Sequence, residues 1–217
     1  TVYSSRLPQP FAHLTSAYLT EALTVARERL IAPHQVAQAQ ARVDGFREYV
    51  GKLQHASADP FFTGEYDRSQ MLLQVAEGSL AEMQHELKTR QLDYLYVQAL
   101  KEAAMGDAGE GEVMSAMEDV FRHRSDLSVL QTAATARINY RRWKAQQTAK
   151  LKSLGVASWL ETARSQRDLR SAEAQLQKLA EEARIHQLEL QRFQMIRQQG
   201  EVITADKRPK SMASVTE

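Results

Sequence analysis

Residues 169–197 read LRSAEAQLQKLAEEARIHQLELQRFQMIR, and the spacing within this stretch determines the architecture that we predict. Its core positions alternate spacings of three and four without a slip, in the order Leu169, Ala172, Leu176, Leu179, Ala183, His186, Leu190, Phe193 and Arg197. An unbroken three-four repeat places these positions on one face of an α-helix that packs against other helices. We therefore predict a long helix over residues 157–199, with Gly200 as its C-terminal cap.

Two further long helices are predicted upstream, over residues 65–105 and 112–154. The first carries a heptad-like series, Leu73, Ala76, Leu80, Met83, Leu87, Tyr94 and Val97. The second carries Val113, Met117, Val120, Leu127, Leu130, Ala134 and Ile138 on one face. Residues 106–111 separate the two helices, because three glycines in six residues cannot continue a helix, and Gly155 caps the second one. Gly78 lies inside the first helix, where glycine costs about 1 kcal/mol relative to alanine.

Two shorter helices are predicted before these, over residues 11–31 and 33–56. Pro33 ends the first, since the residue before a proline is disfavoured in the α region, and it can open the second at its first turn. The second helix places Val36, Ala39, Val43, Phe46, Val50 and Leu53 on one face. Residues 57–64 are predicted to form a loop. Within it, Pro60 and Gly64 flank Phe61 and Phe62, which we expect to anchor the loop in a core.

These elements together predict an all-α fold. Only nine glycines and five prolines occur in 217 residues, and so few helix breakers permit long helices. We expect an elongated antiparallel bundle of long helices, a coiled-coil rod with two shorter N-terminal helices. Its parts are an irregular lead-in (residues 1–10), a two-helix segment (11–58), a rod of three long helices (59–200) and an irregular tail (201–217). Helices of about 40 residues are about 60 Å long.

The charged residues are distributed unevenly, although the formal net charge is only +1. Residues 59–119 contain 13 acidic and four basic residues, residues 120–217 contain 10 acidic and 18 basic residues, and residues 127–160 contain no acidic residue. Two interpretations remain open. The acidic and basic helices can neutralise each other across an antiparallel seam, or the basic face can bind an acidic protein surface, lipid headgroups or nucleic acid. A pI of about 7.9 argues against nucleic acid.

Motifs that would carry catalysis or bind a cofactor are not found. The chain has no cysteine, no glycine-rich phosphate-binding motif and no pair of histidines at metal-binding spacing. Glu82 and His85 match half of a di-iron carboxylate motif, but a second copy is missing. His186 is expected to be a buried core histidine that is hydrogen-bonded to a neighbour, for which Glu182, four residues earlier, is the candidate, and a pH-sensitive or metal-linked role is the alternative. We therefore expect no catalytic, cofactor-binding or metal-binding residues, and we expect that the protein is not an enzyme.

A group of aromatic and basic side chains in the acid-free segment is the candidate partner-binding site. Tyr140 and Trp143 share a helical face amid arginines, and these residue types are enriched at interface hot spots. Core packing is the alternative role for the two aromatic residues. The predicted partner-binding residues are Arg137, Tyr140, Arg141, Arg142, Trp143, Lys144, Lys150 and Lys152.

Residues 138–147 (INYRRWKAQQ), followed by residues 189–193 (ELQRF), resemble the last two helices of sorting-nexin-type BAR domains. The resemblance is confined to the C-terminal part of the chain, from about Ala133 onward. The two helices expected before Pro60 do not fit it, and the region before Trp143 is short for it. The resemblance implies a dimeric helical crescent that binds curved, anionic membranes.

The leading functional expectation is a non-enzymatic structural or adaptor subunit of a larger assembly, with other protein subunits as partners. A homodimer of the BAR type on membrane surfaces is the alternative. No apolar run reaches the length of about 18 residues that a membrane span needs, so we expect a soluble or peripheral protein. The sequence begins with Thr1, as after removal of an organelle-targeting peptide, which favours an intracellular and mitochondrial location.

Overall fold

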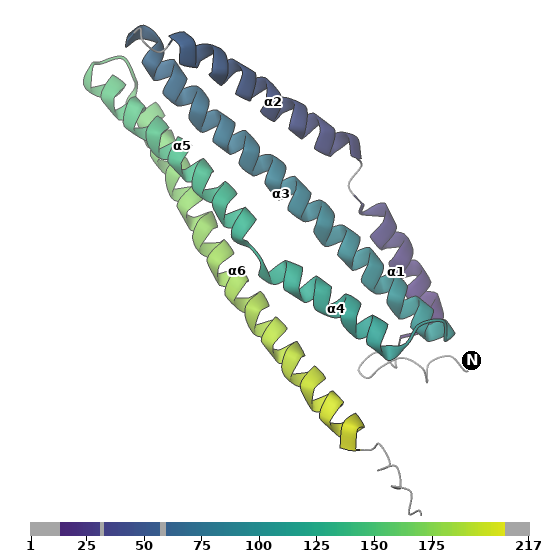
Figure 1. Cartoon of the computed structure of the whole chain (residues 1–217). Helices are drawn as coiled ribbons and strands as arrows, with labels where there is room; N and C mark the ends of the chain where they lie inside the picture. Colours follow the sequence, from purple (N-terminus) through teal and green to yellow (C-terminus); the bar gives the residue numbers. More distant parts are fainter. Residues whose placement is uncertain (1–13, 31–32, 57–59, 207–217) are drawn as a thin grey trace, which may run out of the picture.

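The computed structural model describes residues 14–30, 33–56 and 60–206. Within these ranges the chain is all-helical, with no strand (Figure 1). The helices are α1 (Ser16–Glu28), α2 (Pro33–Ala56), α3 (Pro60–Met105), α4 (Glu110–Ser125), α5 (Ser128–Ser153) and α6 (Trp159–Asp206). None of them is both long and apolar enough to cross a membrane. The all-α class predicted from the sequence is therefore confirmed.

The helices pack side by side in a fixed order (Figure 1). α3 packs against α1 and α2 on one side and against α4 and α5 on the other, and α6 packs against α4 and α5. The pairs Arg124–Asp93 and Arg137–Glu82 show that α3 runs antiparallel to α4 and α5, because one partner advances along the chain as the other recedes. Along this order, α1 and α2 form one edge of the described array and α6 forms the other.

A cluster of buried apolar side chains lies where α1, α3 and α4 meet. Leu19, Leu100 and Val113, from these three helices, are at most 4% exposed and share one cluster with Ala103 and Ala104. Thr15 caps α1 by accepting a hydrogen bond from the Tyr18 backbone N–H at 3.2 Å, which starts this helix at the cluster.

The faces predicted from spacing are confirmed in α2 and α6, whereas in α3 only Leu80 of the predicted series is buried. In α2, Val43, Val50 and Leu53 are buried, and in α6 the core positions Ala172 and Phe193 are 3% and 5% exposed. Arg197 is the exception among the α6 core positions, since its side chain is exposed and pairs with Glu118 of α4. Hydrophobic spacing therefore identified the faces by which α2 and α6 pack.

Two turns between helices depend on glycine. Gly106, with φ of 89°, ends α3, and the Asp107 backbone N–H donates to the Glu102 carbonyl at 2.9 Å. Gly155, with φ of 73°, ends α5, and the Val156 N–H donates to the Leu151 carbonyl at 2.9 Å. Positive φ favours glycine, so both predicted helix ends are confirmed.

The predicted single helix over residues 112–154 is wrong, because the structure divides it at Asp126 and Leu127 into α4 and α5. The Asp126 carboxylate accepts hydrogen bonds from the Ser128 hydroxyl at 2.6 Å and the Ser128 backbone N–H at 3.3 Å. Asp and Ser side chains that bond nearby backbone groups compete with helical hydrogen bonds, and they favour helix starts. The same bonds lower the pKa of Asp126, which keeps this cap ionised.

Three other boundaries differ from the predictions. The predicted loop over residues 57–64 is wrong for its second half, since Pro60 opens α3 at the first turn, where a proline is favoured. The side chains of Phe61 and Phe62 lie outside the described part. α6 continues through Gly200 to Asp206, so Gly200 does not cap it. α1 begins at Ser16 rather than at residue 11, while residues 1–13 and 207–217, with His13, lie outside the described ranges.

Candidate interaction surfaces

The acidic α3 forms ion pairs with arginines of α4 and of the basic α5. Arg124 of α4 bonds Asp93 at 2.7 Å, and Arg137 of α5 pairs with Glu82, both partners lying in α3. The Arg137 and Glu82 side chains are partly buried, at 34% and 23% exposure. Internal neutralisation, one of the two interpretations of the charge pattern, therefore accounts for this part of the basic segment.

Two further predicted residues, Arg141 and Arg142, are held by α6. Arg141 donates to the Asp168 backbone carbonyl at 2.7 Å, and Arg142 lies 3.5 Å from the Glu173 carboxylate. The exposed Arg142–Glu173 ion pair contributes at most about 1 kcal/mol to stability. The partner-binding role of Arg137, Arg141 and Arg142 stays a prediction.

The aromatic pair in the same segment is stacked within α5. The Tyr140 and Trp143 rings lie 6.1 Å apart at an interplanar angle of 22°, and both side chains are half-buried. Lys144, Lys150 and Lys152 differ from the arginines, since all three are exposed and form no ion pair within the described residues. The structure therefore divides the eight predicted partner-binding residues into five that contact other described residues and three exposed lysines without an ion pair.

An apolar cluster that the sequence analysis missed adjoins these lysines. We call residues 151–160, which connect α5 to α6, the hairpin tip. Its exposed apolar side chains are Leu151 (43%), Leu154 (74%), Val156 (72%), Trp159 (71%) and Leu160 (49%). The sequence signal was apolar residues on both sides of Gly155, where a turn between helices is normally polar.

A second exposed apolar surface lies along α6. Ile185, Leu188, Met195 and Ile196 are each between 55% and 57% exposed. Their spacing follows the helical repeat, which places them on one helical face, opposite the face that packs on α4 and α5. We call this the outer face of α6. Four exposed arginines, which form no ion pair in the part of the chain that is described, extend along or flank it: Arg167, Arg170, Arg184 and Arg192.

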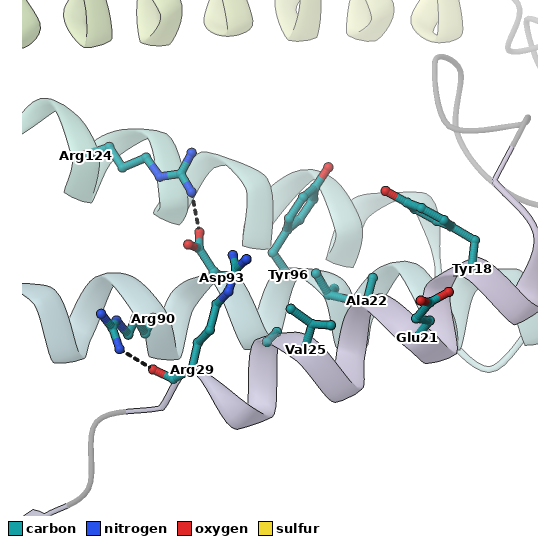
Figure 2. Close-up of a pocket in the computed structure, with 11 residues that line it drawn as sticks. Tyr18, Glu21, Ala22, Val25, Arg29, Arg90, Asp93, Tyr96 and Arg124 are labelled. Atoms are coloured by element: carbon teal, nitrogen blue, oxygen red, sulfur yellow. Dashed lines mark hydrogen bonds and ion pairs between the residues drawn. The ribbon is translucent and has the colours of Figure 1, made fainter.

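An open groove of about 450 Å³ lies between α1, α3 and α4 (Figure 2). Two hydrogen bonds join polar groups that line it. Arg90 donates to the Arg29 carbonyl at 2.6 Å, and Arg124 bonds Asp93. Burial raises the pKa of Tyr96 to about 12, so this phenol stays neutral. The described residues that line the groove include no nucleophile next to a general base, and they serve the packing of α1 on α3.

The histidines form no metal centre in the described residues, where no three His, Asp or Glu side chains gather. Glu82 pairs with Arg137, whereas His85 stacks on His123 with ring centroids 4.3 Å apart. His186 is 32% exposed and bonds Glu189 at 2.9 Å, so the predicted partner Glu182 is wrong. Glu182 and Glu189 both lie within about one turn of His186, but Glu182 forms an ion pair with Lys178.

The pair of stacked histidines predicts a pH dependence of stability. Burial, and then the nearby charge of His123, lower the pKa of His85 below its ordinary value, while Asp126 and Glu86 oppose this effect weakly. Below a pH of about 6.5 the His85 side chain of the unfolded chain is protonated, whereas in the folded chain the lowered pKa opposes this protonation. The free energy of unfolding will therefore fall as the pH falls from about 7.5 to about 5.5. His85→Phe, which keeps the stacking, will flatten this dependence in urea denaturation, and an unchanged slope would contradict the prediction.

Comparison with protein-family models, with curated proteins and with solved structures finds no match to this chain.

Proposed function

We propose that this chain is a non-enzymatic structural subunit that binds another protein chain along the outer face of α6. The observation that carries the proposal is the two-sided character of α6. One side of this helix packs on α4 and α5, and the other exposes four large apolar side chains. Large apolar side chains that are exposed together on one helical face are typical of an interaction site.

The chemistry of the outer face indicates the kind of partner. Apolar residues at helical spacing fit the apolar stripe of a second amphipathic helix. The four arginines on or beside the face favour acidic residues on that helix, because opposite charges set orientation and partner choice. A second copy of α6 would bring two such sets of arginines together, so the charge favours a different chain over a homodimer.

The proposed shape is an elongated antiparallel rod, and the helix lengths support it. α3 has 46 residues and α6 has 48, which correspond to about 70 Å each at 1.5 Å per residue. Among the described residues, only Leu19, Val43 and Val113 are large side chains with exposure below 2%. Long helices with a thin core provide surface for partners rather than an enclosed pocket.

The introduction of charge on the outer face tests the proposal. Ile185→Lys with Leu188→Lys will leave the helical content and melting temperature nearly unchanged, since substitutions at exposed positions usually change stability by about 0.5 kcal/mol or less. The native mass of the protein in its source extract will fall from that of a heteromeric particle to that of the single chain. The matched control is Gln187→Lys with Gln191→Lys, which adds the same charge at exposed positions of α6.

The alternative function, a BAR-like homodimer on membranes, predicts a different result in the same measurement. The native mass of the protein would be that of two identical chains, and mass spectrometry of the purified particle would find no second protein. A monomer in the extract, or a heteromeric particle that persists in the double variant, would contradict the proposed use of α6.

A further inference from the structure

We propose that the hairpin tip, residues 151–160, inserts its apolar side chains into the headgroup region of an anionic lipid bilayer. The inference goes beyond the proposed function, because it assigns a second binding site at the far end of α6 from the outer face. It rests on the exposure of the tip, the free lysines beside it and the hydrogen bonding of its backbone.

The tip exposes large apolar side chains, whereas a turn between two helices is normally polar. Leu154, Val156 and Trp159 are each more than 70% exposed. Figure 1 shows the α5–α6 connection at the opposite end of the helical array from the α3–α4 turn, where it can meet a flat surface. Tryptophan is enriched at membrane–water interfaces because its ring is amphipathic.

The charges beside the tip favour an anionic surface. Lys150 and Lys152 lie in the last turn of α5, and Lys144 lies further down this helix. These side chains can extend along the bilayer edge and place their ammonium groups at phosphate level. The nearest acidic residue in the sequence, Glu161, caps α6 by accepting from the Ser158 N–H at 2.8 Å. This bond lowers the pKa of Glu161, so its charge is ionised and committed to the cap.

Several backbone N–H groups of the tip form hydrogen bonds within the chain, which favours insertion into a region with little water. The N–H groups of Gly155, Val156 and Ala157 donate to carbonyls of the last turn of α5, at 2.9, 2.9 and 3.2 Å. The Glu161 N–H donates to the Ser158 hydroxyl at 3.2 Å. Backbone groups left without partners would oppose insertion, and this turn satisfies these donors internally.

A lipid surface fits the tip better than a protein partner. The exposed side chains lie at the turn that ends the α5–α6 hairpin, and a protein that enclosed them would need a matching concave pocket. The lysines attract an anionic surface without requiring a fixed contact geometry, and mobile lipid headgroups can therefore satisfy them. Binding of a protein at the tip is therefore an outcome to be distinguished in the test.

The test uses the full chain with Trp143→Phe, which leaves Trp159 as the only tryptophan. Vesicles of phosphatidylcholine with phosphatidylserine as the minor lipid will carry the protein upward in flotation and shift the Trp159 emission to shorter wavelength. Vesicles of phosphatidylcholine alone will bind it at least about 10-fold more weakly. In the wild-type chain, Trp159→Ala will weaken binding at least about 10-fold, and Lys150→Gln with Lys152→Gln will weaken it about 20-fold.

Matched variants separate the tip from the rest of the surface. Leu95→Ala removes an exposed leucine of α3, and Lys52→Gln with Lys88→Gln removes two lysines elsewhere, and these variants will bind vesicles like the wild type. No flotation, or flotation that does not depend on Trp159 and the two lysines, would overturn the proposal. An unshifted Trp159 emission, together with loss of a protein partner in Trp159→Ala, would assign the tip to protein binding and overturn it as well.

Discussion

Gly78→Ala will lower the free energy of unfolding by about 1 kcal/mol or more, although alanine is the better helix former. A Cβ at position 78 of α3 would lie 2.9 Å from the Ala133 Cα and 3.0 Å from its Cβ in α5. The helices must then move apart, at a cost of about 1–3 kcal/mol, which outweighs the gain of about 1 kcal/mol in helix propensity. Urea denaturation followed by circular dichroism measures the change.

The matched control for this prediction is Gly45→Ala in α2. No atom lies within 4 Å of a Cβ at position 45, so only the propensity gain of about 0.5–1 kcal/mol remains. The two glycine substitutions will therefore change stability in opposite directions. Stabilisation by both would show that α3 and α5 do not cross closely at Gly78.

Leu100→Ala will lower the free energy of unfolding by about 2–4 kcal/mol. Leu100 is 4% exposed in the cluster where α1, α3 and α4 meet, so its truncation leaves a cavity as well as losing buried apolar surface. A loss of this size is a large part of the stability of an ordinary domain. Thermal and urea denaturation of the purified variant will show the lower midpoint.

Leu95→Ala supplies the comparison within the same helix. Leu95 is 51% exposed, so the same substitution there removes no core contact and will change stability by about 0.5 kcal/mol or less. Equal effects at positions 95 and 100 would mean that α1 and α4 do not bury the face of α3 that carries Leu100.

The packed faces of α2 and α6 were predictable from the sequence because spacing determines which residues share a face, whereas the series predicted for α3 did not include the buried Leu100. The break between α4 and α5 was not predicted, since the apolar series continues across it through Leu127, which is itself buried. The local signal was the pair Asp126 and Ser128, whose side-chain hydrogen bond starts a new helix. The sequence predicted only that Gly78 lowers the stability of its own helix. The packing shows that this glycine also permits the close crossing of α3 and α5.

The interaction surfaces were less predictable than the fold. The acid-free segment directed attention to α5, but sequence cannot tell which arginine finds a carboxylate on another helix. Arg137 and Arg142 pair with α3 and α6, respectively, whereas Lys150 and Lys152 remain exposed. The outer face of α6 was present in the sequence as a second apolar series, which the more regular core series concealed.

Thiol labelling of single-cysteine variants distinguishes a free face of α6 from a packed one, because the chain has no cysteine of its own. In the isolated protein, Leu188→Cys on the outer face of α6 will react at nearly the rate of an unfolded thiol. Ala172→Cys, on the packed face at 3% exposure, will react at least about 100-fold more slowly. In the native extract the thiol at position 188 will also become protected. Equal reactivity at the two positions in the isolated chain, or an unprotected position 188 in the extract, would contradict the two-sided role of α6.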